Sequence, residues 1–475
     1  MKTNGINGGI KKTDKRAASF FLRLGLLSED DHPLLKRVVM AWFAFLLIMM
    51  AWGLRDVAVS WQKARGWEYL WIAESIVKGD CFCFADCKKG WRPREGCDKF
   101  RITAHEEPVY PYLTAAAFKA LGSKYGGLLV MIFQVIALFF TSCIVYLLGR
   151  RVFNAPAGLL AGSVLPLLNR HLTATFVPSI FAGLMIAISA YLILLCIEKV
   201  SVRRGIILGL TLGFTALLYA PTLAFIPVAV FFLLVGKTPR RSIALKTAAV
   251  VIFTAAAVLS VWTIRNFMVF GQIIPVRTGF GINVHQSNPV LAESFSAQSR
   301  GNTKAGLLSW TARNAGEAVR LSFGYDRQLA IYKRSFDIIR LDAPPGYEYN
   351  EAEMDRVALR KTLEFVLSQP QTFITLTFYR IYAFFFMLGW KAAIISVFFF
   401  AGAVITARNT KVRILLLLIL AYASPYFLAV TWWYRYRYPI EPVILVVACY
   451  LPVLVFSRLY ALSRKSAVRD ESVAS

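Results

Sequence analysis

The stretch VVMAWFAFLLIMMAWGL, residues 38–54, is an apolar run of 17 residues that contains no charged side chain. An α-helix of about 20 such residues is long enough to span the hydrocarbon core of a bilayer. Further apolar runs of comparable length follow, in a chain of 475 residues that is 57% hydrophobic and only 17% charged. The sequence therefore predicts an all-α, polytopic membrane protein rather than a soluble chain of about three domains.

Residues 1–37, ahead of this run, form a polar and basic segment. The segment is longer than the charged region of a typical signal peptide, and AWGLRD (51–56) offers no convincing small-residue cleavage site. We therefore interpret residues 38–54 as an uncleaved first span that follows a cytoplasmic N-terminal segment.

The formal net charge of +27 could indicate a nucleic-acid partner, but the basic residues do not form one stripe. Many lie in short connections between apolar runs, which is the pattern of cytoplasmic loops. This pattern predicts that the chain contacts membrane lipids and does not bind nucleic acid. It also predicts that both termini lie on the cytoplasmic side of the cell inner (plasma) membrane. The basic positions include Arg150, Arg151, Lys199, Arg203, Arg204, Lys237, Arg240, Arg241, Lys246, Arg408, Lys411, Arg413 and those of the tail from Arg458.

The same charge rule predicts a bundle of about ten transmembrane helices, in the range of about nine to twelve, with further helices in the external loops. Residues 373–388 are assigned to the membrane interface, because counting them as a span would place the basic residues 408–413 outside. The predicted spans are 38–54, 128–148, 157–168, 172–196, 206–220, 222–235, 248–264, 392–405, 414–430 and 443–456.

These assignments divide the chain into five parts. The parts are a cytoplasmic segment 1–37, a transmembrane core 38–264 with an external loop 55–125, an extracytoplasmic segment 265–371, an interfacial helix with the C-terminal spans over 372–457, and a cytoplasmic tail 458–475.

The external loop contains GWEYLWIAESIVKGD, residues 66–80, which has the pattern of an amphipathic helix. Glu68 stands there among tryptophans and aliphatic residues, where a carboxylate must be paired, solvated or used. One interpretation is an interfacial pair with Arg65, three residues earlier. The other is a carboxylate in a partly dry cavity, where burial raises its pKa toward the range useful for taking a proton from a hydroxyl.

The stretch RITAHEEPVYPYLTAAAFKALG, residues 101–122, gathers His105, Glu106 and Glu107 just before a helix that restarts at PVYP. Acids in this place complement the helix dipole.

Arginines alternate with tyrosines in TWWYRYRYPIEP, residues 431–442, at the outer end of a predicted span. Arg435 and Arg437 are either snorkelling residues of an aromatic belt or guanidinium groups that bind a phosphate at the membrane surface. Arg265 lies at the outer end of another span, in VWTIRNFMVFGQIIPVRTGFGINVHQSNP (261–289), and can assist them.

The seven cysteines fall into two groups. Cys143, Cys196 and Cys449 lie in predicted spans and are expected to be inert core thiols. Four others crowd the external loop, and their extracytoplasmic position favours two disulfides over a four-cysteine zinc site with an unusual spacing. These four are Cys81, Cys83, Cys87 and Cys97, and the sequence does not select among the three possible pairings.

Five motifs occur in an order that resembles the polytopic GT-C glycosyltransferases related to protein O-mannosyltransferases and lipid A aminoarabinose transferases. They are GWEYLWIAESIVKGDCF, TAHEEPVYPYLTAAAFKALG, WTIRNFMVFGQIIPV with GINVHQSNP, EAEMDRVALRKTLEFVLSQP and RYRYPIEP, and the similarity runs from about residue 38 to about residue 460. The resemblance implies a GT-C-like bundle, a sugar donor carried on a polyprenyl phosphate, an active site on the outer face and inversion at the anomeric carbon.

The resemblance also implies roles for individual residues. Glu68 fills the place of the catalytic base, although it stands alone beside Tyr69 where many relatives have an Asp–Glu pair. Relatives commonly show an aromatic residue and Pro–Pro where this chain has residues 105–108, and this difference makes Glu107 a rival base. The remaining pocket residues are Tyr69, His105, Glu106, Tyr110 and Tyr436.

The predicted activity is transfer of the sugar to a lipid, glycan or protein of the cell envelope. Arg435, Arg437 and Arg265 would hold the phosphate charge as it develops, so that no metal and no other cofactor is required. The alternative is a non-enzymatic transporter or flippase of a lipid-linked sugar, which uses the same arginines but needs no base.

Overall fold

The computed structural model confirms the all-α prediction. It describes residues 26–28, 30–61, 68–79, 81–85, 100–236, 241–290, 334–339, 342, 344, 349–429 and 436–474. Within these ranges helices dominate, and two three-residue strands, β1 (Cys83–Ala85) and β2 (Phe100–Ile102), pair antiparallel with Phe84 opposite Arg101.

The N-terminal half contains eight helices and two short 3₁₀ turns among the described residues. They are α2 (Pro33–Ser60), α3 (Glu68–Lys78), α4 (Val109–Val152), α5 (Ala155–Asn169), η2 (Arg170–Ala174), α6 (Ser179–Glu198), α7 (Val202–Leu218), η3 (Ala220–Ala224), α8 (Phe225–Val235) and α9 (Arg241–Phe270).

The second half begins with two short helical segments and continues with longer helices. They are α10 (Phe280–His285), η4 (Gln286–Val290), α14 (Glu351–Ser368), α15 (Pro370–Tyr382), η5 (Ala383–Met387), α16 (Trp390–Thr406), α17 (Thr410–Leu428), α18 (Glu441–Ala448) and α19 (Tyr450–Ala474).

Six helices of the described chain are long and apolar enough to cross a membrane, or up to seven if a bent pair is counted as one span. A multi-pass membrane protein is therefore confirmed, whereas the count of about ten stays a prediction. Two of the predicted spans form helices of only 15 and 17 residues, α5 and α7. Helix α4 is longer than its predicted span, since it begins at Val109 and runs through a bend at Gly122.

The bent pair consists of residues 370–387 and α16, which meet at an angle of 106°. Residues 373–388 therefore do not continue the direction of α16, and their place in the interface stays a prediction. Arg380 of this segment is fully buried in protein. It donates hydrogen bonds to Asn288 Oδ1 at 2.9 Å and to the carbonyl oxygen of Phe427 at 3.3 Å, which ties α15 to η4 and to the end of α17.

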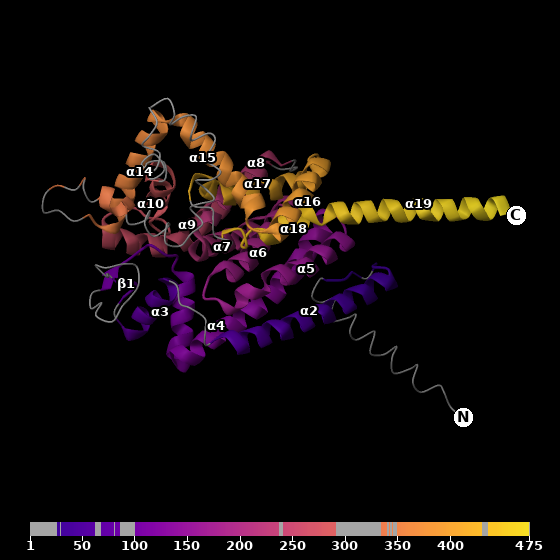
Figure 1. Ribbon diagram of the computed structural model, residues 1–475, viewed down its shortest axis with the longest axis horizontal. Coiled ribbons are helices and arrows are strands. Elements are labelled where there is room, and N and C mark those ends of the chain that lie inside the picture. Colours follow the sequence, from indigo (N-terminus) through magenta and orange to yellow (C-terminus); the bar gives the residue numbers. More distant parts are fainter. Residues whose placement is uncertain are drawn as a thin grey trace, which may run out of the picture.

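The molecule has two different ends (Figure 1). The C-terminal helix α19 and the start of α2 lie toward one end, whereas β1, α3, α10 and α14 lie at the other. Basic residues hold the first end together: Lys411 pairs with Glu198 at 2.8 Å, and Arg150 pairs with Asp31 at 2.9 Å. The connections that the charge rule assigns to the cytoplasm thus gather at one end, although the side of the membrane stays a prediction.

Helix α18 forms the centre of the bundle. All eight of its residues are buried, and it packs against α4, α5, α6, α16 and α17. The residue before it, Ile440, is also fully buried. In the turn over 436–440, Arg437, Pro439 and Ile440 are buried, whereas Tyr436 and Tyr438 are partly exposed.

Helices α7 and α9 pack so closely that three positions of α7 have no room for a side chain. Gly205, Gly209 and Gly213 recur every four residues along α7. A Cβ at Gly205 would lie 2.9 Å from Thr247 Cγ2, and one at Gly209 would lie 2.6 Å from the carbonyl oxygen of Val251. Such a stripe of small residues lets two helix backbones approach in a membrane, where van der Waals contact drives association.

Substitution of Gly209 by valine should separate this pair. We expect Gly209→Val to lower the free energy of unfolding by about 1–3 kcal/mol, because the added atoms have no space and the helices must move apart. The change is measured by heating the purified protein in detergent and monitoring unfolding through the reaction of the buried thiols with a thiol reagent. Leu210→Val is the matched control on an exposed face; equal melting temperatures for the two variants would contradict the packing described.

Candidate active site

Two glutamates lie buried just before α4. Glu106 and Glu107 expose only 3% and 1% of their surfaces. Arg277, in the loop between α9 and α10, places Nη1 3.4 Å from Glu106 Oε2 and 3.4 Å from Glu107 Oε1. Glu107 Oε1 also accepts a hydrogen bond of 3.0 Å from the backbone N–H of Ala220, just after α7. Three distant stretches of chain therefore meet at Glu106, Glu107 and Arg277, which we call the acid–arginine cluster.

The environment of the cluster changes its proton affinities. Burial raises the pKa of Glu107, because a carboxylate loses hydration there, and this effect outweighs the lowering by Arg277. Burial acts in the opposite direction on Arg277, but the two carboxylates raise the pKa of its guanidinium well above the ordinary value. The arginine therefore stays charged, while Glu107 holds a proton more strongly than an exposed glutamate does.

One oxygen of the cluster has no partner in the described part of the chain. Glu107 Oε2 is buried and accepts no hydrogen bond from any described residue. Leaving a buried polar atom in this state costs about 1–3 kcal/mol, so the atom favours any hydroxyl group that reaches it. A carboxylate with one oxygen held and the other open is suited to accept a proton from such a hydroxyl.

Aromatic side chains surround the cluster. The rings of Tyr69 and Tyr110 meet edge to face with centroids 5.5 Å apart, and Tyr436 stacks on Tyr426 at 4.9 Å. The Tyr426 hydroxyl oxygen lies 3.2 Å from that of Tyr219, the residue before Ala220, so this pair of rings adjoins the segment that binds Glu107. The structure thus brings together residues that the sequence analysis selected from three separate motifs.

Glu68 is the first residue of α3 and is half-buried. Its neighbour Tyr69 contacts Tyr110 at the start of α4, so α3 lies against the same region as the cluster. The role of Glu68 as the base stays a prediction.

The His105 ring packs against the loop that carries Arg277. A Cβ on Gly279 would lie 3.0 Å from this ring, and the backbone φ of Gly279 is +92°. Both the close approach and the left-handed conformation favour glycine at this position.

Arg437 is buried with 1% of its surface exposed. It donates hydrogen bonds to the carbonyl oxygen of Phe385 at 2.7 Å and to Ser396 Oγ at 3.0 Å, and it pairs with Glu441 at 3.4 Å. These contacts hold η5 and α16 against α18. Phosphate binding by Arg437 stays a prediction, but in this structure the guanidinium is engaged by protein groups. Arg435 lies outside the described residues.

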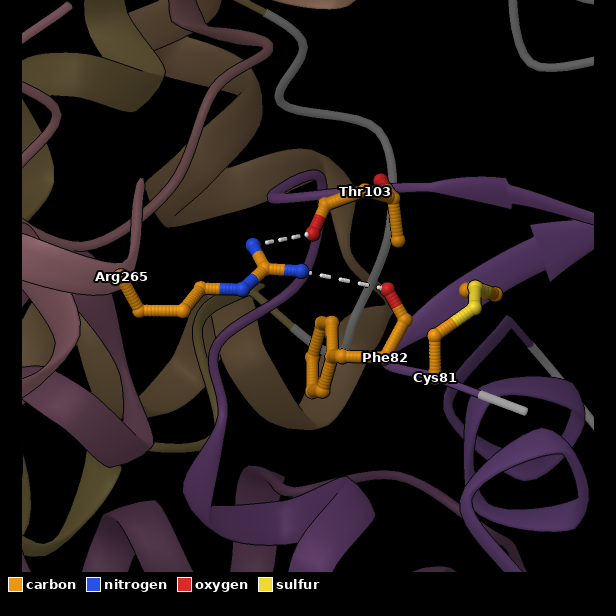
Figure 2. The surroundings of a disulfide bond; sticks show 5 residues. Cys81, Phe82, Thr103 and Arg265 are labelled. Carbon is orange, nitrogen blue, oxygen red and sulfur yellow. Dashed lines mark hydrogen bonds between the residues drawn. A yellow bond between two sulfur atoms is a disulfide. The ribbon is translucent and has the colours of Figure 1, made fainter. Parts of the chain in front are cut away.

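Arg265 is likewise engaged by the protein. Its guanidinium donates to the carbonyl oxygens of Thr103, at 2.7 Å, and Phe82, at 3.4 Å, as Figure 2 shows. It also lies 4.7 Å from the centre of the Trp262 ring. These contacts fasten the strand pair to the end of α9, and a role for Arg265 at the phosphate stays a prediction.

Cys81 and Cys83 form a disulfide beside this contact (Figure 2). Cys87 and Cys97 lie outside the described residues, so the second predicted bridge is not placed. In the described part of the chain, no group of three or more His, Cys, Asp or Glu residues is arranged to hold a metal ion. The three cysteines of the predicted spans are free and buried, as expected for core thiols.

The sequence analysis did not select Arg277 as a site residue. A signal was present, because Arg277 is the one Lys, Arg, Asp or Glu in residues 266–292. A lone charge in a long stretch that is otherwise uncharged indicates a partner elsewhere in the chain or a function. The sequence does not show which of the 27 acidic residues that partner is.

Residues 105–264 match the sequence model of the dolichyl-phosphate-mannose-protein mannosyltransferase family. This segment includes Glu106 and Glu107 and ends one residue before Arg265. The match confirms, over these residues, the predicted resemblance to polytopic GT-C glycosyltransferases. No curated protein matches the chain.

Nine chains of solved structures also match. One is the archaeal oligosaccharyltransferase AglB from Archaeoglobus fulgidus in complex with an inhibitory peptide and a dolichol-phosphate, at 14% identity and a TM-score of 0.47, covering 90% of this chain and 52% of that chain. An apo oligosaccharyltransferase from the same archaeon has 16% identity and a TM-score of 0.49, with coverage of 90% and 52%. ArnT from Cupriavidus metallidurans bound to undecaprenyl phosphate has 13% identity and a TM-score of 0.33, with coverage of 86% and 77%. The chain spans about half the length of the archaeal oligosaccharyltransferases.

Removal of the Arg277 charge should destabilise the protein in a pH-dependent way. Without the guanidinium, the pKa of Glu107 rises further. When the pKa of a carboxyl is higher in the folded than in the unfolded protein, it contributes stability that is fully present below the unfolded-state pKa. That stability is lost as the pH rises through the folded-state pKa. We therefore expect Arg277→Gln to melt at a lower temperature than wild type, with a larger difference at pH 8 than at pH 5.5.

At pH 8 we expect Arg277→Gln to lower the free energy of unfolding by about 1–3 kcal/mol. This is less than the cost of breaking a fully buried ion pair, because 24% of the Arg277 side chain is exposed. Arg413→Gln removes an equal charge from an exposed position at the other end and serves as the control. If the difference in melting temperature between Arg277→Gln and wild type did not vary with pH, the electrostatic description of the cluster would be contradicted.

Proposed function

We propose that this chain is a membrane glycosyltransferase that moves a sugar from a polyprenyl-phosphate donor to an acceptor of the cell envelope on the extracytoplasmic side. The observation that carries the proposal is the buried acid–arginine cluster at the start of α4. It lies at the opposite end of the bundle from the basic connections that pair with Glu198 and Asp31. The family match supports the proposal, because the matched segment contains both glutamates.

The reaction needs a base for the acceptor hydroxyl. As the acceptor oxygen attacks the anomeric carbon, a carboxylate takes its proton and the bond from that carbon to the phosphate oxygen breaks. Attack from the face opposite the phosphate inverts the anomeric configuration. No acid is needed for the leaving group, because the lipid phosphate departs as a stabilised anion.

Two carboxylates compete for the role of base. The geometry favours Glu107, because burial raises its pKa and its buried Oε2 accepts no hydrogen bond from any described residue. The resemblance favours Glu68, which stands at the start of α3 beside Tyr69. In either case Arg277 orients the acid pair, since its guanidinium contacts both Glu106 and Glu107.

The donor phosphate requires a cation of its own. Arg277 already compensates two carboxylates, and Arg437 and Arg265 are engaged by protein oxygens. We therefore propose Arg435, the remaining arginine of the 431–442 motif, as the first phosphate ligand. A guanidinium provides paired donors that suit phosphate oxygens.

Transfer assays on reconstituted protein with labelled donor lipid test the assignment. We expect Glu107→Gln to lower the transfer rate by about 10²–10⁴-fold, the usual contribution of a general base. Glu74→Gln, an exposed glutamate on α3, should transfer at the wild-type rate.

Near-full transfer by Glu107→Gln together with loss in Glu68→Gln would assign the base to Glu68 instead. Passage of intact donor lipid across the bilayer by the wild-type protein, with no cleavage of the sugar–phosphate bond, would support the transporter alternative and overturn the enzyme.

A further inference from the structure

A third carboxylate links the two segments that carry the cluster. Glu351 is the first residue of α14. Its Oε2 accepts a hydrogen bond of 2.6 Å from the Thr103 hydroxyl, and its Oε1 accepts one of 3.2 Å from the Ala104 N–H and another from the Thr278 hydroxyl. One side chain thus receives three donors from two segments that are far apart in the sequence.

Both segments lead directly into the cluster. Thr278 follows Arg277, and Thr103 stands three residues before Glu106. The segments also contact each other, because the Thr278 N–H donates to the carbonyl oxygen of Ala104 at 2.9 Å. The position of the guanidinium relative to the carboxylates therefore depends on the register that Glu351 sets between these segments.

The start of α14 does not need Glu351 as a cap. Asn350 Oδ1 accepts from the Glu353 N–H at 2.9 Å, and Glu353 Oε2 accepts from the Asn350 N–H at 2.8 Å, which completes a reciprocal capping box. The Glu351 carboxylate is left to contact other parts of the chain. One turn later, Asp355 Oδ1 accepts from the Ile282 N–H at 2.9 Å and so extends the same attachment to α10.

We propose that Glu351 is a positioning residue of the active site, which holds the segments around Thr103 and Thr278 in register so that Arg277 meets the acid pair. This inference rests on the proposed function for its catalytic consequence, but not for the attachment itself. The extracytoplasmic segment thereby becomes part of the catalytic apparatus without supplying a group that touches substrate. Misplacement of a catalytic group by about 1 Å lowers a rate by as much as about 10²-fold.

Hydrogen exchange and kinetics on the full chain test the inference together. In Glu351→Ala we expect amide exchange to rise about tenfold or more at residues 103–105 and 278–282, while the bundle helices exchange as in wild type. The maximal transfer rate should fall by about 10–10²-fold with the KM for donor unchanged. In Glu351→Gln, both the slow amide exchange and the transfer rate should be largely restored, because the amide oxygen still accepts a hydrogen bond and the threonine hydroxyls can reorient.

Glu364→Ala, an exposed glutamate of α14, is the control and should change neither measurement. Unchanged exchange at both segments in Glu351→Ala would overturn the attachment, and raised exchange with a wild-type transfer rate would overturn the positioning role. A wild-type protein without transfer would contradict the proposed function alone, since the exchange measurement still decides whether Glu351 sets the register.

Discussion

The contact of one guanidinium with two buried carboxylates is the interaction on which the candidate site depends. Glu106 and Glu107 are both buried, and Arg277 supplies the cation that contacts them from a different part of the chain. Removing a charged pair from water opposes folding, so the surrounding structure must hold it in place. The hydrogen bonds from the Ala220 N–H to Glu107 and from Thr103 and Thr278 to Glu351 fulfil this requirement.

The bundle supplies the rigidity that such a site requires. Small residues allow α7 and α9 to touch along their backbones, and α18 fills the centre with eight buried residues. Two further arginines stabilise the junctions between helices rather than the site: Arg437 joins α16 to α18, and Arg380 joins α15 to η4. Apart from Glu441, the hydrogen-bond partners of these two arginines are neutral oxygens, so the arginines bind carbonyl and side-chain groups more by hydrogen bonds than by ion pairing.

The fold class followed from the sequence because apolar runs of transmembrane length have few other solutions. Span boundaries were less predictable: α4 extends well beyond its apolar run, since its first turns are stabilised by packing against α3 rather than by lipid. Glu107 could be selected from its unusual place before a helix. Arg277 and Glu351 could not, because their importance depends on contacts between distant segments. For Arg437 the sequence pattern was misleading. Its alternation with tyrosines indicates a motif at the protein surface, whereas the structure buries this arginine.

The residues of the acid–arginine cluster, and Glu351 that supports it, come from parts of the chain that are far apart in the sequence. Arg277 lies 171 residues beyond Glu106, and Glu351 lies 248 residues beyond Thr103. During synthesis, a ribosome therefore completes the first half of the bundle before Arg277 is made, and burial at this stage favours the protonated form of Glu107. Arrival of Arg277 then lowers the pKa of Glu107 relative to this precursor, because the guanidinium favours the carboxylate. Assembly of the two halves is thus coupled to the charge of the site, and a chain that stalls between them carries Glu107 without the guanidinium that compensates it.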